Sequence, residues 1–265
     1  EVRGTDEHLE QFTIRLFLFL LSKWQDAAPV QKIVLALIVV GFPNFLSPLL
    51  GQPTISWEKS YGGTSWDYGQ DIVQTTPDMG YIAIGRTYSN DGDVSGNHGG
   101  HDMWVIKLDA NGNLLWQKAL GGTAYDEGYS IIQTSNGDYI AAGYTQSNDG
   151  DVSGNHASGT KDMWVVKLNG SGNILWQKCY GGTGDEYAYS ISEVSGGNFI
   201  IAGSSSSSDG DVTSGNKGSA DVWIVKIDGN GTILWEKSMG STGYDYADDI
   251  KQNSTGGYIV AASAG

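Results

Sequence analysis

The sequence is poor in cysteine, proline and basic residues. One cysteine, Cys179, stands among 265 residues, which excludes an intrachain disulfide framework and a cysteine-based metal cluster. With 15 Lys and Arg against 30 Asp and Glu, the formal net charge is -15. Because phosphate backbones require clustered cations, we expect no nucleic acid among the partners of so acidic a chain.

Long hydrophobic runs are also missing, since no run reaches the roughly 20 apolar residues that a membrane-spanning helix needs. The run at 33–42 follows Lys32 and has the length of a signal-peptide core. We therefore expect residues 1–51 to be a helical N-terminal leader, a signal peptide cleaved near Gly51, and residues 52–265 to be secreted or displayed on the cell surface. Only an uncleaved leader would contact a membrane. The alternative is that residues 7–42 form two ordinary packed helices.

Glycine (39 residues), tyrosine (14) and tryptophan (9) are plentiful, and tryptophan marks an internal repeat. A Trp-Glu/Gln-Lys phrase followed by a glycine returns at intervals of about 60 residues, a spacing typical of repeat architectures. The phrase begins at Trp57, Trp116, Trp176 and Trp235. A second series keeps the same interval: Trp104, Trp164 and Trp223.

Each period contains four strand-like runs. In one copy these are residues 128–134, 139–145, 163–168 and 173–178, with Asn-Gly turns that supply the positive φ hairpins need. One sheet cannot bury both of its faces, so the copies must cover one another. The pattern predicts an all-β protein, a β-propeller of four-stranded antiparallel blades. The predicted blades are about 70–118, 128–178 and 187–237, with a partial blade at 247–263.

Two pieces of the repeat lack their partners. A fourth-type strand at 54–60 comes first, and the partial blade at 247–263 holds two strands. Open sheet edges promote aggregation. We therefore expect the remaining blades of a larger chain, or an oligomer, to close the ring.

The segment from Lys107 to Trp116 resembles the strand-turn-strand signature of quinoprotein-type propeller blades, although it is one residue shorter between Asp109 and Trp116. Over residues 54–265 the repeat is similar to the β-propeller repeats of exported bacterial and archaeal proteins. This resemblance implies a propeller fold and export, and it implies little about activity.

One acidic loop type, at 89–97, predicts a calcium site. Oxygen-bearing side chains occupy alternate positions from Asp91, Gly96 follows, and Asp102 falls at position twelve. Copies at 147–155 and 208–216 are less regular. The alternative is that these side chains cap backbone amides without a metal. The candidate calcium ligands are Asp91, Asp93, Ser95, Asn97, Asp102, Asp149, Asp151, Ser153, Asn155, Asp209, Asp211 and Thr213.

A second loop type begins at Gly62 and should emerge on the same face as the first. It predicts a ring of carboxylates beside exposed aromatic side chains, a surface suited to an extracellular glycan or protein. The alternative is a repeated structural cap between blades. The carboxylates are Asp67, Asp126, Glu186 and Asp245, and the aromatics are Trp66, Tyr125 and Tyr244.

Support for catalysis is weak. The histidines are His8, His98, His101 and His156, and no third ligand is spaced for zinc. No Ser/His/Asp arrangement or phosphate-binding loop occurs. We therefore predict a non-enzymatic extracytoplasmic binding or surface-display module, stabilised by calcium if the loop sites are occupied. The alternatives are a fragment of a propeller enzyme, quinoprotein-like or polysaccharide-active, and a purely structural spacer.

Overall fold

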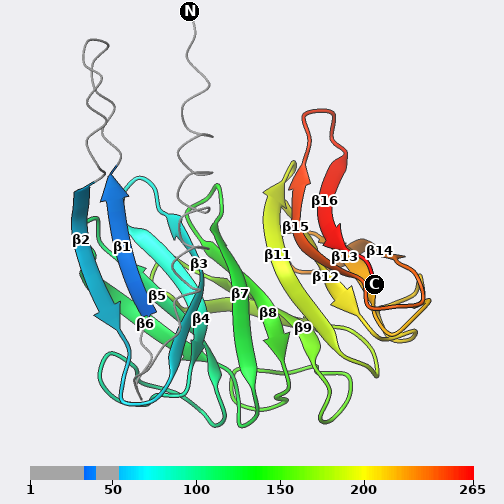
Figure 1. Cartoon of the computed structure of the whole chain (residues 1–265), viewed down its shortest axis with the longest axis horizontal. Helices are drawn as coiled ribbons and strands as arrows, with labels where there is room; N and C mark the ends of the chain where they lie inside the picture. Colours follow the sequence, from blue (N-terminus) through cyan, green and yellow to red (C-terminus); the bar gives the residue numbers. More distant parts are fainter. Residues whose placement is uncertain (1–32, 40–53) are drawn as a thin grey trace, which may run out of the picture.

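The computed structural model describes residues 33–39 and 54–265, and all regular secondary structure in these ranges is β-strand (Figure 1). Three antiparallel sheets have four strands each, in consecutive order. The first comprises β3 (Asp67–Gln74), β4 (Tyr81–Thr87), β5 (Asp102–Leu108) and β6 (Leu114–Leu120). The second comprises β7 (Asp126–Gln133), β8 (Tyr139–Thr145), β9 (Asp162–Leu168) and β10 (Ile174–Tyr180). The third comprises β11 (Glu186–Val194), β12 (Asn198–Ser205), β13 (Asp221–Ile227) and β14 (Ile233–Met239).

Two further sheets have two strands each. One pairs β1 (Ile33–Val39) with β2 (Thr54–Tyr61), and the other pairs β15 (Tyr246–Gln252) with β16 (Tyr258–Ser263). The five sheets follow one another in chain order around an open arc (Figure 1). Within the described ranges, no sheet combines strands from both ends of the chain. The predicted repeat of four-stranded antiparallel sheets is therefore confirmed, whereas the closed ring is not observed.

The sheets stack through their first strands. Strand β7 packs against β3, β4 and β5, β11 packs against β7, β8 and β9, and β15 packs against β11, β12 and β13. The third strand of each complete sheet is almost wholly buried, and its tryptophan, at Trp104, Trp164 or Trp223, is 0% exposed. Each indole packs in a core shared with the preceding sheet, as expected for a sheet buried on both faces. Burying a side chain of this size stabilises the fold by more than about 2 kcal/mol.

A glycine on each second strand allows close approach to a bulge in the first strand. Gly143 pairs with Gly128, beside the register shift between Gly128 and Ser130. A Cβ atom at Gly143 would overlap the carbonyl oxygen of Glu127, and the equivalent overlap arises at Gly85 and Gly203. The bulge therefore requires glycine opposite it.

Residues 33–39 correct the predicted helical leader, because they form strand β1. This strand pairs antiparallel with β2, from Ile33 opposite Tyr61 to Val39 opposite Thr54. A β-branched run favours a strand, and the edge of β2 offers unpaired backbone groups for it. The rest of the predicted leader lies outside the described residues. In the described part of the chain, no helix is long and apolar enough to cross a membrane.

Candidate ligand-binding face

The two predicted loop types meet at three of the junctions between sheets. Asp91 accepts hydrogen bonds from the Thr64 amide and hydroxyl, both at 2.8 Å. Asp149 binds Thr123 in the same way, and Asp209 binds Thr183. The two loop types therefore emerge together, as the repeat predicted.

The candidate calcium ligands form hydrogen bonds to different groups of the protein. In the first loop, Asp91 faces Thr64, Asp93 accepts from the Gly62 amide at 3.1 Å, and Asp102 accepts from the His98 amide at 2.9 Å. The other candidates likewise have their own hydrogen-bond partners: Ser95, Asn97, Asp149, Asp151, Ser153, Asn155, Asp209, Asp211 and Thr213. In the described ranges, no group of three or more His, Cys, Asp or Glu side chains is placed to hold a metal. The geometry favours the capping alternative, and calcium binding stays a prediction.

The carboxylate column does not form an exposed acidic ring, and this corrects the surface predicted from the second loop type. Asp67, Asp126, Glu186 and Asp245 are at most 2% exposed. Asp126 accepts from the Gly122 amide and the Ser147 hydroxyl, both at 2.8 Å, and also from Thr145. These carboxylates satisfy turn donors that burial would otherwise leave unpaired. They are the repeated structural caps considered as the alternative.

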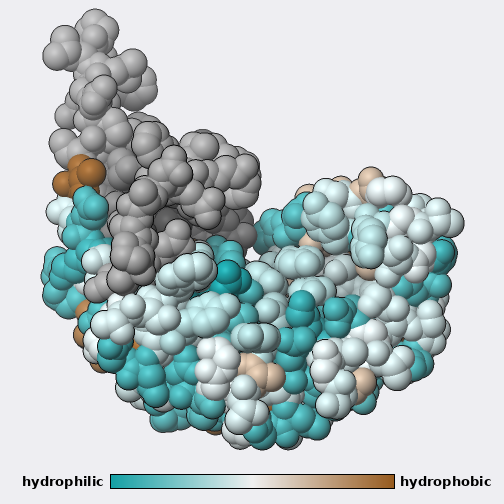
Figure 2. Space-filling view, turned by 60° about the horizontal axis from the view of Figure 1, so that its bottom comes forward, coloured by the Kyte–Doolittle hydropathy of each residue, from teal (hydrophilic) through white to brown (hydrophobic). Residues whose placement is uncertain are grey.

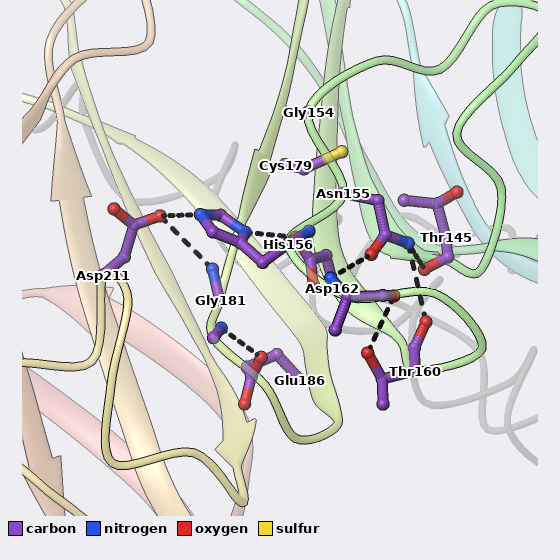
Figure 3. Close-up of polar contacts among 12 residues, drawn as sticks. Thr145, Gly154, Asn155, His156, Thr160, Asp162, Cys179, Gly181, Glu186 and Asp211 are labelled. Carbon is purple, nitrogen blue, oxygen red and sulfur yellow. Dashed lines mark hydrogen bonds and ion pairs between the residues drawn. The ribbon is translucent and has the colours of Figure 1, made fainter.

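Histidines bridge neighbouring sheets beside two of these caps, and Figure 3 shows the bridge at His156 beside Glu186. His156 Nδ1 lies 2.5 Å from Asp162 Oδ2, and His156 Nε2 lies 3.5 Å from Asp211 Oδ2 of the next sheet. His98 has the same relation to Asp102, at 2.7 Å. Burial alone would lower the pKa of His156, but the hydrogen bond and charge of Asp162 raise it above its usual value. Each bridge therefore favours the protonated imidazole.

The predicted aromatic column is exposed. Trp66 is 54% exposed, Tyr125 is 49% exposed and Tyr244 is 70% exposed. The structure thus separates the two predicted columns, because the aromatics reach solvent while the carboxylates beside them are buried. Only the aromatic column remains available to a ligand, and its role in binding stays a prediction.

Further tyrosines on the first strands join this exposed column. Tyr129 on β7 lies 5.2 Å from Tyr189 on β11, measured between ring centroids. Tyr189 stacks on Tyr187 at 5.7 Å and contacts Tyr246 on β15 at 6.3 Å. We call this row, together with Trp66, Tyr125 and Tyr244, the tyrosine face. It runs across successive sheets because every first strand lies on the same side of its sheet.

One ion pair in this face breaks the repeat. Glu127 on β7 occupies the register position that holds Tyr187 on β11, and it is 2% exposed. Arg86 Nη1 lies 2.6 Å from Glu127 Oε1, and the guanidinium lies 4.3 Å from the Tyr68 ring centroid. The Gln70 amide donates to the same carboxylate oxygen at 3.0 Å.

The residue before each third strand also varies between copies. His101 stands before β5, Lys161 before β9 and Ala220 before β13. His101 is sandwiched between Tyr88 and Tyr125, each with its ring centroid at 4.8 Å. Burial lowers the pKa of His101 to about 4, so the imidazole is neutral near pH 7.

A pocket of about 340 Å³ opens where the third sheet meets β15. Such a volume suits a small ligand or a single side chain. Its walls include Tyr187, Tyr189, Tyr244 and Tyr246, together with Ser204 and Asp185. Burial raises the pKa of Tyr189 to about 12, so this ring carries its hydroxyl proton at neutral pH.

Sequence reasoning missed Arg86, Glu127, Lys161 and the tyrosines of the first strands. It compared the repeated loops, where the copies agree, and these proved to be caps. The sequence carried one signal for these residues, which is a difference in residue type between copies of the repeat. Glutamate stands at position 127, where the other first strands carry tyrosine. A site that recognises one ligand needs such differences, because identical copies would offer identical surfaces.

Comparison with known proteins gives little further information. No family model matches the chain. It is 26% identical over 201 residues to the regulatory protein FlaEY of Caulobacter vibrioides, an alignment that covers 72% of this chain and 20% of FlaEY. The chain thus spans about a fifth of the length of this curated relative. A crystal structure of a protein of unknown function from Bacteroides caccae is 12% identical, with a TM-score of 0.25, and the match covers 71% of this chain and 72% of that one.

Proposed function

We propose that the chain is a non-enzymatic binding module that acts outside the cytoplasm and contacts an extracellular glycan or protein through its tyrosine face. The single observation that carries this proposal is the row of partly exposed tyrosines, which crosses successive sheets and surrounds a pocket of about 340 Å³. The extracytoplasmic location rests on the resemblance to exported repeat proteins and on the leader prediction, of which residues 33–39 form strand β1 and the rest falls outside the described residues.

Tyrosine suits such a surface because its ring buries a large area at low entropic cost while its hydroxyl donates and accepts hydrogen bonds. The view of the surface in Figure 2 is mostly hydrophilic, with isolated apolar residues. The tyrosine face therefore offers a described surface that is suited to contact a partner.

The ionisable groups of this face support binding over catalysis. Glu127 is committed to Arg86 and Gln70, and His101 is 6% exposed between two aromatic rings. A general acid or base must reach the proton that it transfers. A propeller enzyme fragment and a structural spacer remain the alternative functions.

We also propose that the sheets are propeller blades. The Asp126 amide donates to the His101 carbonyl at 2.7 Å, which ties the start of one sheet to the third strand of the preceding sheet. The same bond joins Glu186 to Lys161 and Asp245 to Ala220. Repetition of one junction geometry is what a ring of blades requires. A closed ring would need further blades, from a longer chain or another copy.

The test is binding to printed arrays of glycans and peptides. Array ligands that bind the wild-type protein should bind the Tyr187→Ala/Tyr246→Ala variant at least tenfold more weakly. Leu175→Ala, at a 51% exposed position on β10, is the matched control and should bind as wild type does. Equal loss in the control variant, or no loss in the tyrosine variant, would reject the tyrosine face as the binding surface. Turnover of an array ligand would favour the enzyme instead.

A further inference from the structure

Three junctions between sheets share an equivalent position, and a different side chain stands there in each. The carbonyl groups of His101 and Lys161 each accept from the first residue of the next sheet at 2.7 Å, and the Ala220 carbonyl accepts at 2.8 Å from Asp245, directly before β15. The three side chains therefore start from equivalent points in the fold. What each one contacts can be compared directly.

At the first two junctions the chain fills this position itself. His101 lies between the rings of Tyr88 and Tyr125. At the second junction, Lys161 Nζ lies 4.9 Å from the Tyr144 ring centroid and 4.8 Å from that of Tyr187, and it donates to the Tyr187 hydroxyl at 2.5 Å. An ammonium group in this position is thus held by two aromatic rings and a hydroxyl.

At the third junction the position is open. Ala220 replaces the lysine, and Ser204 on β12 occupies the register position that Tyr144 holds on β8. Both replacements are small. The pocket of about 340 Å³ occupies the space, and Ala220, Ser204 and Ser206 are part of its wall.

We propose that this pocket binds the ε-ammonium group of a lysine side chain from a partner protein, in the place that Lys161 takes one junction earlier. The inference rests on the proposed binding function and specifies its ligand. The rings of Tyr189 and Tyr246 supply the π faces, because Lys161 already lies over Tyr187. The Ser204 hydroxyl and the second lone pair of Ser206 Oγ, which accepts from the Asp185 amide at 2.7 Å, supply hydrogen-bond acceptors.

Charge complementarity supports a cation. Asp185 lines the pocket, and the negative charge of Asp248 acts on Tyr189 in its wall. No Lys, Arg or His is among the described residues that line the pocket, and Lys161 of the preceding junction contacts the Tyr187 ring of its wall. The formal net charge of -15 would attract cationic partners over longer distances.

A primary ammonium on a flexible stem fits better than other cations. Its three N–H groups can satisfy hydroxyl acceptors, which a trimethylammonium group cannot. Its aliphatic stem can pack along tyrosine rings. An amino sugar carries the same ammonium on a wider, branched frame, and it is the competing source that the experiment must separate.

The experiment titrates the chain with the peptide acetyl-Gly-Lys-Gly-amide and follows binding by NMR. The Nε-acetylated and Nε-trimethylated peptides and a glucosamine trimer are the comparison ligands. We expect the lysine peptide to bind at least tenfold more tightly than each of the others. Equal binding of the acetylated or trimethylated peptide would overturn ammonium recognition. Tighter binding of the glucosamine trimer would overturn lysine as the source.

Pocket-filling variants locate the site. Ala220→Lys should place a resident ammonium in the pocket and reduce lysine-peptide binding at least tenfold. Ala220→Met fills the same space without charge and should do likewise, so one variant suffices if the other fails to fold. Leu175→Ala should bind as wild type does. Undiminished binding in a folded Ala220 variant would overturn the assignment. If array ligands still bind the tyrosine face while the lysine peptide does not, this inference fails and the proposed function stands.

Discussion

The Arg86 guanidinium on β4 and the Glu127 carboxylate on β7 form a 2.6 Å ion pair that joins two neighbouring sheets. The Glu127 side chain is 3% exposed, so the ion pair is almost wholly shielded from solvent on the carboxylate side. Arg86 is also the only arginine among the described residues. The pair therefore sets this junction apart from the two that follow it.

Removing one partner should be costly. We expect Arg86→Met to lower the free energy of unfolding by about 3 kcal/mol, because it leaves the buried Glu127 carboxylate without its cation. The double variant Arg86→Met/Glu127→Tyr should regain most of this loss, since tyrosine stands at the equivalent position of the other first strands. Urea unfolding of the single and double variants measures the coupling. Additive losses would contradict the assigned role of the pair.

The glycine opposite each bulge should tolerate no side chain. We expect Gly143→Ala to lower the free energy of unfolding by about 2 kcal/mol or more, because its Cβ would overlap the Glu127 carbonyl oxygen. Gly170, with its nearest heavy atom at 4.0 Å, is the matched control, and Gly170→Ala should be neutral within about 1 kcal/mol. Denaturant midpoints at equal m-values report the difference. Similar losses in both variants would show that the bulge is not the cause.

The histidine bridges should make stability depend on pH. The pKa values of His98 and His156 are raised in the folded chain, so each contributes stability that is present below about pH 6.5 and lost as pH rises through its folded value. We therefore expect the His98→Asn/His156→Asn variant to lose more stability at pH 6 than at pH 8.5, by roughly 1 kcal/mol after allowing for partial exposure.

The measurement is the thermal unfolding midpoint of the wild-type protein and of the His98→Asn/His156→Asn variant between pH 6 and pH 8.5. Burial raises the pKa of the partner Asp102 to about 6, so its own contribution also falls as pH rises from about 4 to 6. His101 acts in the opposite sense, because its lowered pKa favours the fold as pH rises from 4 to 6.5. Comparing variant with wild type at each pH cancels the His101 contribution. A loss that grows toward pH 8.5 would contradict the bridges.

The acidic loops should be stable without a metal. Because Asp91, Asp149 and Asp209 already accept two hydrogen bonds each from a threonine, removing calcium should leave the thermal midpoint unchanged within about 1 °C. Melting with added calcium and with chelator makes the comparison. A drop of several degrees under chelation would restore the calcium site that the loop sequence predicts.

The sequence predicted the repeat well because its signals are local. Tryptophan spacing and Asn-Gly turns located the strands, and the buried Trp104, Trp164 and Trp223 confirm that the third strands are covered on both faces. The sequence alone did not predict that Asp126 is a buried cap. A carboxylate in a predicted loop is expected to be exposed to solvent, and its burial depends on a neighbouring sheet that the local sequence does not reveal.

The tyrosine face was harder still to predict. Glu127 and Arg86 lie 41 positions apart in the chain, and only the stacking of β7 on β4 brings them together. The same is true of Lys161 and Tyr187, which belong to different sheets. Strand β1 shows the opposite problem, since an apolar run of signal-peptide length also satisfies the requirements of an edge strand.

The most direct test of the tyrosine face is an NMR titration of protein with ¹³C-labelled tyrosine rings, using the tightest ligand from the glycan and peptide arrays. We predict that the shifts concentrate on Tyr187, Tyr189, Tyr244 and Tyr246, while Tyr258, which packs against Trp235 away from the pocket wall, stays unchanged. Shifts confined to Tyr258 and other tyrosines outside the tyrosine face would contradict the proposed binding surface.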